Sequence, residues 1–149
     1  MEARADLVSE LFGAVGRFRR QLRRSGAGLD TAGLTEAQAE LLRLVGRRPG
    51  ISIREAAVEL GLVPNTASTL VSKLAADNLL VRTVDANDRR VGRLRLTDPA
   101  QHLADESRAA RRAALSEVLD ELDGNEVDAL GEGLAVMAKM TGLLQDRER

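Results

Sequence analysis

The feature that most constrains this sequence is a three-residue break, Gly61 to Val63, between two short segments with helical patterning. Ser52 and Glu55 have the spacing of a capping box at the start of the first segment, and Gly61 is placed to end it. Pro64 opens the second segment, where its missing N–H costs no hydrogen bond. Two short helices with so short a connection are predicted to form a helix-turn-helix.

The second of these helices has two unlike faces at about 100° per residue. The face predicted to pack on the core holds Ala67, Leu70, Val71 and Leu74. The other face holds small hydrogen-bonding side chains and one lysine: Asn65, Thr66, Ser68, Thr69, Ser72 and Lys73. Because this helix holds no acidic residue before Asp77, its polar face suits the DNA major groove, which is about 12 Å wide. We expect the first four to contact base edges, and Ser72 and Lys73 to contact phosphates.

A cationic hairpin is predicted next, with strands at 79–84 and 91–96. In the second strand, alternation places Leu94 and Leu96 inward and Arg93 and Arg95 outward. Five arginines lie between positions 82 and 95, although the formal net charge of the whole chain is -1.

An arginine at the tip of this hairpin is placed to enter a narrow minor groove, where the potential is most negative. Asp88 would hold that arginine in position. We therefore expect Asp88, Arg89 and Arg90 to form the contact of this hairpin with DNA. The alternative is a solvated hairpin with no partner.

Further helices are predicted on both sides of this region. Apolar residues recur at helical spacing from Asp6 to Leu22, giving an amphipathic helix with a broad buried face. A shorter helix begins at a Thr35–Gln38 capping box and stops at Pro49. After the hairpin, a long helix is expected from Asp98 and Pro99, with Gln101 at capping-box spacing, to about Leu122. A last helix, capped by Asn125, carries an apolar stripe from Val127 to Leu144.

The outer helices offer more apolar surface than a small domain can cover by itself. Burial against a second copy of the chain is the simplest solution, so we expect a homodimer. Two-fold symmetry then predicts a pseudo-palindromic DNA site with half-sites about 10 bp, or about 34 Å, apart.

Composition excludes several other classes of function. With no cysteine, thiol catalysis and thiolate metal sites are absent, and His102 has no neighbours at metal-ligand spacing. The sequence shows no phosphate-binding glycine loop and no nucleophile paired with a base, so we expect no enzyme activity, no cofactor and no metal. No apolar run can span a bilayer and the N-terminus is too acidic and polar for a secretory signal, so a cytoplasmic protein without membrane contact is expected.

The run "LGLVPNTASTLVSKLAADNLLVRTVDANDRRVGRLRLTD" resembles the winged helix-turn-helix of MarR-type transcriptional regulators, in which Asp85, Asp88 and Arg90 precede "LRLT". The resemblance implies a mainly α fold with a small β-hairpin (α+β), in which dimerisation helices at both termini flank the winged helix-turn-helix. It divides the chain into 1–33, an N-terminal dimerisation helix and connector; 34–98, the DNA-binding domain; and 99–149, the C-terminal dimerisation helices. It also implies that Arg90 contacts the minor groove and that Asp88 orients it.

Three departures from that family occur. Val63 stands where a capping Ser or Thr is usual, Ala86 replaces a frequent wing proline, and Pro99 and Ala100 replace a usual glycine. Val63 gives the helix that begins at Pro64 a weaker cap, and the departures together bear on the rigidity of the wing.

The function implied is that of a DNA-binding regulator, a repressor that binds its operator as a homodimer and is released by a small-molecule effector. Many relatives hold such effectors between the dimerisation helices and the winged domain; with only two phenylalanines as aromatics, a pocket here is expected to be aliphatic. A winged-helix module that binds an acidic protein is the alternative function. The arginines of the run "RFRRQLRR" are expected to cap the C-terminus of their own helix and to solvate its outer face. A membrane-surface helix or a nucleic-acid arm is the less favoured alternative.

Overall fold

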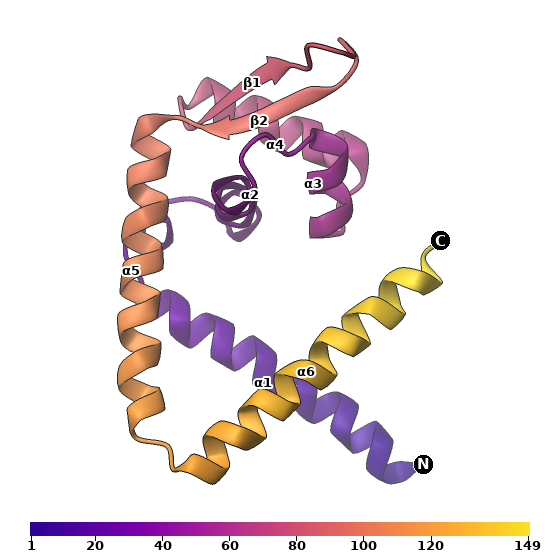
Figure 1. The fold of residues 1–149 in the computed structure, drawn as a ribbon, viewed down its shortest axis with the longest axis vertical. Helices are drawn as coiled ribbons and strands as arrows, with labels where there is room; N and C mark the ends of the chain where they lie inside the picture. Colours follow the sequence, from indigo (N-terminus) through magenta and orange to yellow (C-terminus); the bar gives the residue numbers. More distant parts are fainter. The chain divides into compact units, whose positions relative to one another are not determined.

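The computed structural model describes all of residues 1–149, which form two compact units, Met1–Arg111 and Arg112–Arg149. The fold is mainly helical with one antiparallel hairpin, as predicted (Figure 1). The elements are α1 (Glu2–Arg24), the 3-10 helix η1 (Gly28–Thr31), α2 (Glu36–Arg47), α3 (Ile53–Leu60), α4 (Pro64–Ala76), β1 (Leu80–Val84), β2 (Gly92–Leu96), α5 (Asp98–Asp120) and α6 (Gly124–Arg147). No helix has both the length and the apolar content needed to cross a membrane.

The helix-turn-helix forms with the end signals that the sequence predicts. Capping boxes are present at Thr35, before α2, and at Ser52, before α3. Gly61 ends α3 in the left-handed conformation with φ 65°, which glycine adopts without steric cost. Pro64 is the first residue of α4, and the preceding Val63 contributes no side-chain cap. The turn between α3 and α4 therefore follows directly from local sequence.

One apolar core joins α2, α4 and the hairpin. Its fully buried side chains include Leu42 of α2, Leu74 of α4 and Leu94 of β2. Of the residues predicted to face the core from α4, Ala67, Val71 and Leu74 are buried, whereas Leu70 is half-buried and packs against the cluster. In the hairpin Leu80 pairs with Leu96 and Arg82 with Leu94. The position of the hairpin beside α4 is thus set by burial of its leucines.

Two helix starts differ from prediction by one or two residues. The cap of α5 is Thr97 rather than Asp98: its hydroxyl accepts the N–H of Ala100 and donates to the carbonyl of Asn78. The amide of Gln101 donates to Asp105 and takes no part in a capping box. The cap of α6 is Asp123 rather than Asn125, because Asp123 and Glu126 complete a capping box. In both cases a second capping residue lay just upstream.

Neither outer helix buries a residue within the chain. The prediction that α1 has a broad buried face is wrong for the single chain, since Phe12 and Phe18 are exposed by 78% and 56%. In the second unit, α6 likewise has no buried residue. Its exposed apolar side chains are Val127, Leu130, Leu134, Val136, Met137, Met140, Leu143 and Leu144.

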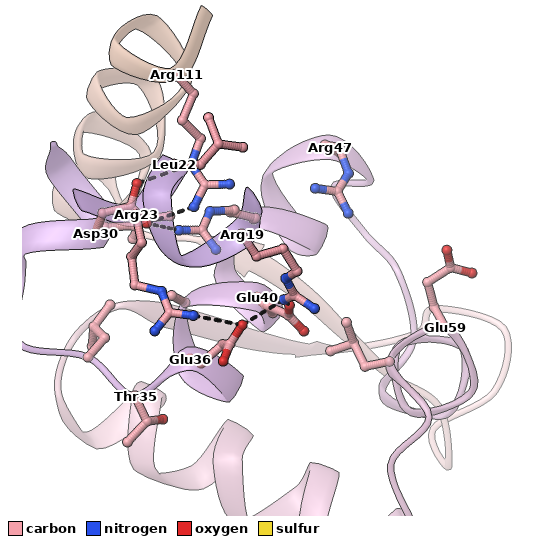
Figure 2. A pocket seen from close by; sticks show the side chains of 15 residues that line it. Arg19, Leu22, Arg23, Asp30, Thr35, Glu36, Glu40, Arg47, Glu59 and Arg111 are labelled. Atoms are coloured by element: carbon pink, nitrogen blue, oxygen red, sulfur yellow. Dashed lines mark hydrogen bonds and ion pairs between the residues drawn. The ribbon is translucent and has the colours of Figure 1, made fainter. Parts of the chain in front are cut away.

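Arginines near the end of α1 pair with acids of α2, around a cavity of about 310 Å³ (Figure 2). Arg19 pairs with Glu36 and Glu40, and Arg23 lies 2.9 Å from Glu36. These two side chains of the "RFRRQLRR" run therefore bridge to another helix, which the sequence pattern did not indicate. The hydrogen bond from Arg19 is the main reason that the pKa of Glu36 is lowered.

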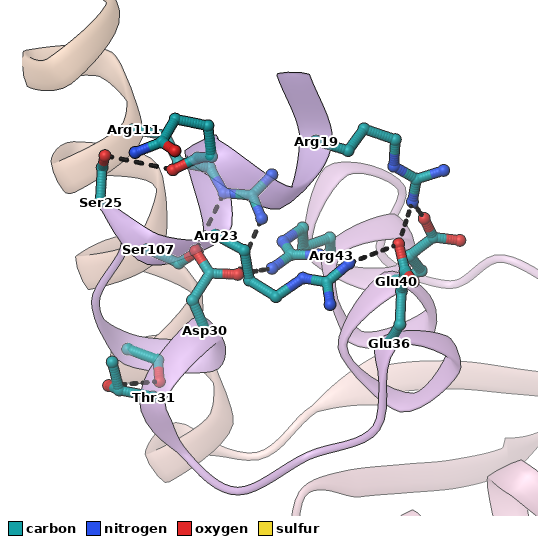
Figure 3. A network of polar contacts seen from close by, with 12 residues as sticks. Arg19, Arg23, Ser25, Asp30, Thr31, Glu36, Glu40, Arg43, Ser107 and Arg111 are labelled. Atoms are coloured by element: carbon teal, nitrogen blue, oxygen red, sulfur yellow. Dashed lines mark hydrogen bonds and ion pairs between the residues drawn. The ribbon is translucent and has the colours of Figure 1, made fainter. Parts of the chain in front are cut away.

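Asp30 of η1 is the centre of a polar cluster that ties α2 to α5 (Figure 3). Its carboxylate is 1% exposed and accepts hydrogen bonds from Arg43 of α2, and from Nε and Nη2 of Arg111 at 3.0 and 2.7 Å. Ser107 donates to it at 3.4 Å. Gly28 lets η1 approach α5 this closely, because a Cβ there would lie 2.1 Å from the carbonyl oxygen of Leu103.

Burial by itself raises the pKa of Asp30, but the hydrogen bond from Arg111 and the charges of Arg43 and Arg111 outweigh it, so the pKa is lowered. Burial, together with the charge of Arg111, lowers the pKa of the Arg43 guanidinium. The fold thus favours the ionised form of the Asp30 carboxyl group. Because the pKa of Asp30 is lower in the folded chain than in the unfolded one, its contribution to stability is present above the unfolded pKa of about 3.9 and is lost as pH falls through the folded pKa.

We expect Asp30→Asn to lower the free energy of unfolding by about 2–4 kcal/mol at neutral pH, because Arg43 and Arg111 lose their counter-charge in a largely buried place. Chemical denaturation of both proteins at a series of pH values measures this. The difference between them should shrink as pH falls below about 3.9. A difference that is independent of pH would show that the charge of Asp30 contributes nothing.

Candidate nucleic-acid interface

The exposed face of α4 carries all six residues of this helix that the sequence analysis assigned to DNA. Side chains at all six positions are exposed: Asn65, Thr66, Ser68, Thr69, Ser72 and Lys73. The opposite face is held in the core by Ala67, Val71 and Leu74. The structure therefore brings these residues together on one accessible surface, while their contacts with DNA stay a prediction.

Local hydrogen bonds on α4 leave most of this surface open to a partner. The hydroxyl of Thr69 donates to the carbonyl of Asn65 at 2.9 Å, so Thr69 keeps only acceptor capacity. The amide side chain of Asn65 has no hydrogen-bond partner in the chain and keeps both its donors and its acceptor. Lys73 lies 3.3 Å from Asp77 in an exposed pair, which is weak enough to exchange for a phosphate.

At the hairpin tip, Asp88 holds Arg90 by three hydrogen bonds. One carboxylate oxygen accepts the backbone N–H of Arg90 at 3.0 Å and its Nε at 3.2 Å, and the other accepts from Nη2 at 3.4 Å. The side chain of Arg90 is nevertheless 91% exposed, so its guanidinium is oriented without being covered. The hydrogen bond from the Arg90 side chain, followed by that from its N–H, lowers the pKa of Asp88 and favours its ionised form. Arg89, beside it, is exposed and unpaired.

The base of the hairpin is fixed by a second carboxylate. Asp85 accepts the N–H of Asn87 at 3.0 Å, and Arg93 donates to Asp85 at 2.9 Å and to the carbonyl of Gly50 at 3.3 Å. The N–H of Asn87 and then the hydrogen bond from Arg93 lower the pKa of Asp85. Arg93 lies on the strand face opposite buried Leu94, as predicted, but its contacts with Asp85 and Gly50 make it a half-buried structural residue. These contacts close the turn around Ala86 without the usual proline.

Between α3, α4 and the hairpin lies an open cleft of about 780 Å³, lined by three arginines: Arg54, Arg82 and Arg90. Sequence reasoning did not single out Arg54 and Arg82. The signal for Arg82 was strand alternation in β1, which puts it on the same side of the hairpin as buried Leu80. Arg54 gives no such signal, because its place in the cleft depends on how α3 packs.

The single histidine of the chain lies outside this surface. His102 is exposed on α5, and its Nε2 lies 2.8 Å from Glu106.

Comparison with known proteins agrees with this geometry. Residues 32–91 match the model of the MarR family. The chain is 28% identical over 99 residues to the HTH-type transcriptional repressor MdtR of Bacillus subtilis (strain 168), a match that covers 66% of this chain and 64% of that protein, so less than two thirds of the relative is spanned.

Solved structures share the fold over nearly the whole chain. That of FabT from Streptococcus pneumoniae, in complex with DNA, has a TM-score of 0.81 at 18% identity and covers 93% of this chain and 98% of that one. The PcaV transcriptional regulator of Streptomyces coelicolor, with its natural ligand, has a TM-score of 0.64 at 23% identity, covering 88% and 91%. Within the region that the family model matches, the capped helix-turn-helix and the arginine-bearing hairpin thus make the chain similar to the winged-helix regulators of the MarR family.

Proposed function

We propose that this protein is a sequence-specific DNA-binding repressor that acts as a homodimer and is released by a small molecule. The observation that carries the proposal is the pairing of two surfaces on one rigid core. One is the acid-free polar face of α4, and the other is the exposed guanidinium of Arg90, held by Asp88. These surfaces suit the two grooves of a duplex.

In the major groove, α4 would read base edges through short side chains. Asn65 offers a donor and an acceptor on one amide, the combination that pairs with the N6 and N7 edge of adenine. Thr66, Ser68 and Thr69 offer hydroxyls and, for the threonines, methyl groups that can touch thymine. Ser72 and Lys73 lie further along the helix and would meet phosphates.

In the adjoining minor groove, Arg90 would supply the cation at the tip of the hairpin, with Arg89 beside it. A guanidinium gains most where the groove is narrow and its potential most negative. Because Asp88 orients Arg90 before binding, less side-chain freedom is lost on contact. We therefore assign DNA binding to residues 34–98 and dimerisation to residues 1–33 and 99–149.

Dimerisation is supported by the uncovered apolar faces of α1 and α6. Phe12 and Phe18 on α1, and Leu134 and Leu144 on α6, are all more than half exposed in the single chain. Apolar faces of this length on soluble proteins mark interaction sites, and a second copy is the simplest partner.

The effector site that we propose is the cavity of about 310 Å³ beside α1, η1 and α2. As expected from composition, no phenylalanine lines it, but charged side chains predominate where aliphatic ones were expected, among them Arg19, Arg47 and Glu59. A small polar molecule fits such a lining better than an apolar one. The structure of PcaV with its natural ligand supports release by a small molecule, and the description of MdtR as a repressor supports a repressor role.

The direct test is a binding titration with the intergenic DNA next to the gene of this protein, against a random duplex of equal length at physiological salt. We expect the intergenic duplex to bind at least about 10³-fold more tightly, the lower end of the usual specificity range. Equal affinity for the two duplexes would contradict the proposed function, and a tight complex with an acidic protein would favour a protein-interaction module instead.

Arg90→Ala should weaken binding to the preferred duplex by about 1.5–3 kcal/mol, the usual cost of losing a charged hydrogen bond. Asp88→Asn is the matched variant: it keeps Arg90 but removes the charge that orients it, so a smaller loss is expected. Fluorescence anisotropy measures both, and thermal melting and size-exclusion chromatography verify fold and dimer. Unchanged affinity in Arg90→Ala would remove the hairpin from the mechanism.

Asn65→Ala should relax discrimination at a single base pair by about 1–3 kcal/mol if Asn65 makes a bidentate contact with adenine. Competition binding with duplexes substituted at each position measures this. An equal loss on every sequence would show that Asn65 contacts only the DNA backbone.

A further inference from the structure

In a duplex, one sugar–phosphate strand separates a major groove from the adjoining minor groove. A protein that inserts one element into each of two adjoining grooves must straddle that strand. Here the two elements are α4 and the tip of the hairpin, and between them lies the cleft of about 780 Å³. The proposed function therefore requires a DNA strand to pass through this cleft.

The cleft is electrostatically suited to such a strand. Arg54 and Arg82 are exposed and form no ion pair within the chain. Asp88, the single acid in the lining, is already paired with Arg90. The cleft therefore carries two uncompensated positive charges, between the groove-reading surfaces rather than on either of them.

The absence of a side chain at Gly92 leaves room for the guanidinium of Arg82 at this position. A Cβ on Gly92 would lie 2.8 Å from Nε of Arg82 and 3.2 Å from Cδ1 of Ile53. Arg82 and Gly92 lie on the same face of the hairpin. Arg82 is paired with Leu94, which is two residues from Gly92 in β2 and so shares its face. The glycine thus leaves room for the guanidinium to lie across the strand and reach the cleft.

We propose that Arg82 and Arg54 bind phosphates of the strand between the two grooves, with Gly92 positioning Arg82. This inference rests on the proposed function and adds two contacts that set affinity and register without reading sequence. Arg95 provides a contrast within the same hairpin: it is exposed, pairs with Val81 on the other side of the sheet, and does not line the cleft.

The test is the salt dependence of binding to the intergenic and random duplexes, from about 50 to about 200 mM salt, for wild type, Arg82→Ala, Arg54→Ala and the control Arg95→Ala. Each lost phosphate contact should lower the slope of log K against log salt by about 0.9. We expect this change for Arg82→Ala and Arg54→Ala, equally on both duplexes, and the wild-type slope for Arg95→Ala.

Two further variants separate charge from position and guard against misfolding. Arg82→Lys keeps the cation and should keep the slope, whereas Gly92→Ala keeps every charge but should displace Arg82 and lower the slope. Circular dichroism melting verifies that each variant is folded.

The inference is overturned if wild type prefers the intergenic duplex but Arg82→Ala and Arg54→Ala keep its slope, or if Arg95→Ala lowers the slope as much as they do. Equal affinity of the wild type for the two duplexes would instead overturn the proposed function, and this inference with it.

Discussion

The apolar core shared by α2, α4 and the hairpin is the interaction on which the rest of the structure depends. Leu42, Leu74 and Leu94 are fully buried in it and come from three different elements. Close-packed protein interiors have low compressibility, so elements that meet in a core keep their relative positions. The polar face of α4 and the hairpin tip are therefore presented as one rigid surface, which is what adjoining grooves of a duplex require.

The local distribution of charge in this protein matters more than its net charge. A net charge of -1 gives no general attraction to DNA, yet the hairpin and the start of α3 concentrate exposed arginines. The two acids of the hairpin offset only part of this field, because five arginines lie between positions 82 and 95, and each acid also has a structural use. Asp85 closes the base of the turn with Arg93, and Asp88 orients Arg90. Carboxylates near a surface that we propose binds phosphates are tolerable when they are already paired.

The proposed effector cavity lies beside the Asp30 cluster, which links α2 to α5. Asp30 joins Arg43 of α2 to Arg111 of α5, and both arginines also line the cavity. A ligand that competed for those guanidinium groups would weaken the link between α2 and α5. Because α2 packs against β2 and α4, a shift there would reach the surface that we propose reads DNA.

Several features were predictable from sequence because their causes lie within a few residues. The capping boxes at Thr35 and Ser52, the left-handed Gly61 and the start of α4 at Pro64 each depend on local backbone hydrogen bonding or on one residue's conformational range. The exposed polar face of α4 followed from helical periodicity, and the pairing of Asp88 with Arg90 from their closeness along the chain.

Sequence by itself thus determined the order of the elements apart from η1, the helix-turn-helix and the polar face of α4, since short-range hydrogen bonds and residue periodicity specify them. Beyond the Asp88–Arg90 pair, tertiary structure decided which arginines are free, because their pairing depends on acids that are more distant in sequence. Arg19 meets Glu36, Arg43 and Arg111 meet Asp30, and Arg82 remains unpaired across Gly92. Coulombic interactions act through space, so no pattern along the chain could have sorted these side chains into structural and available ones.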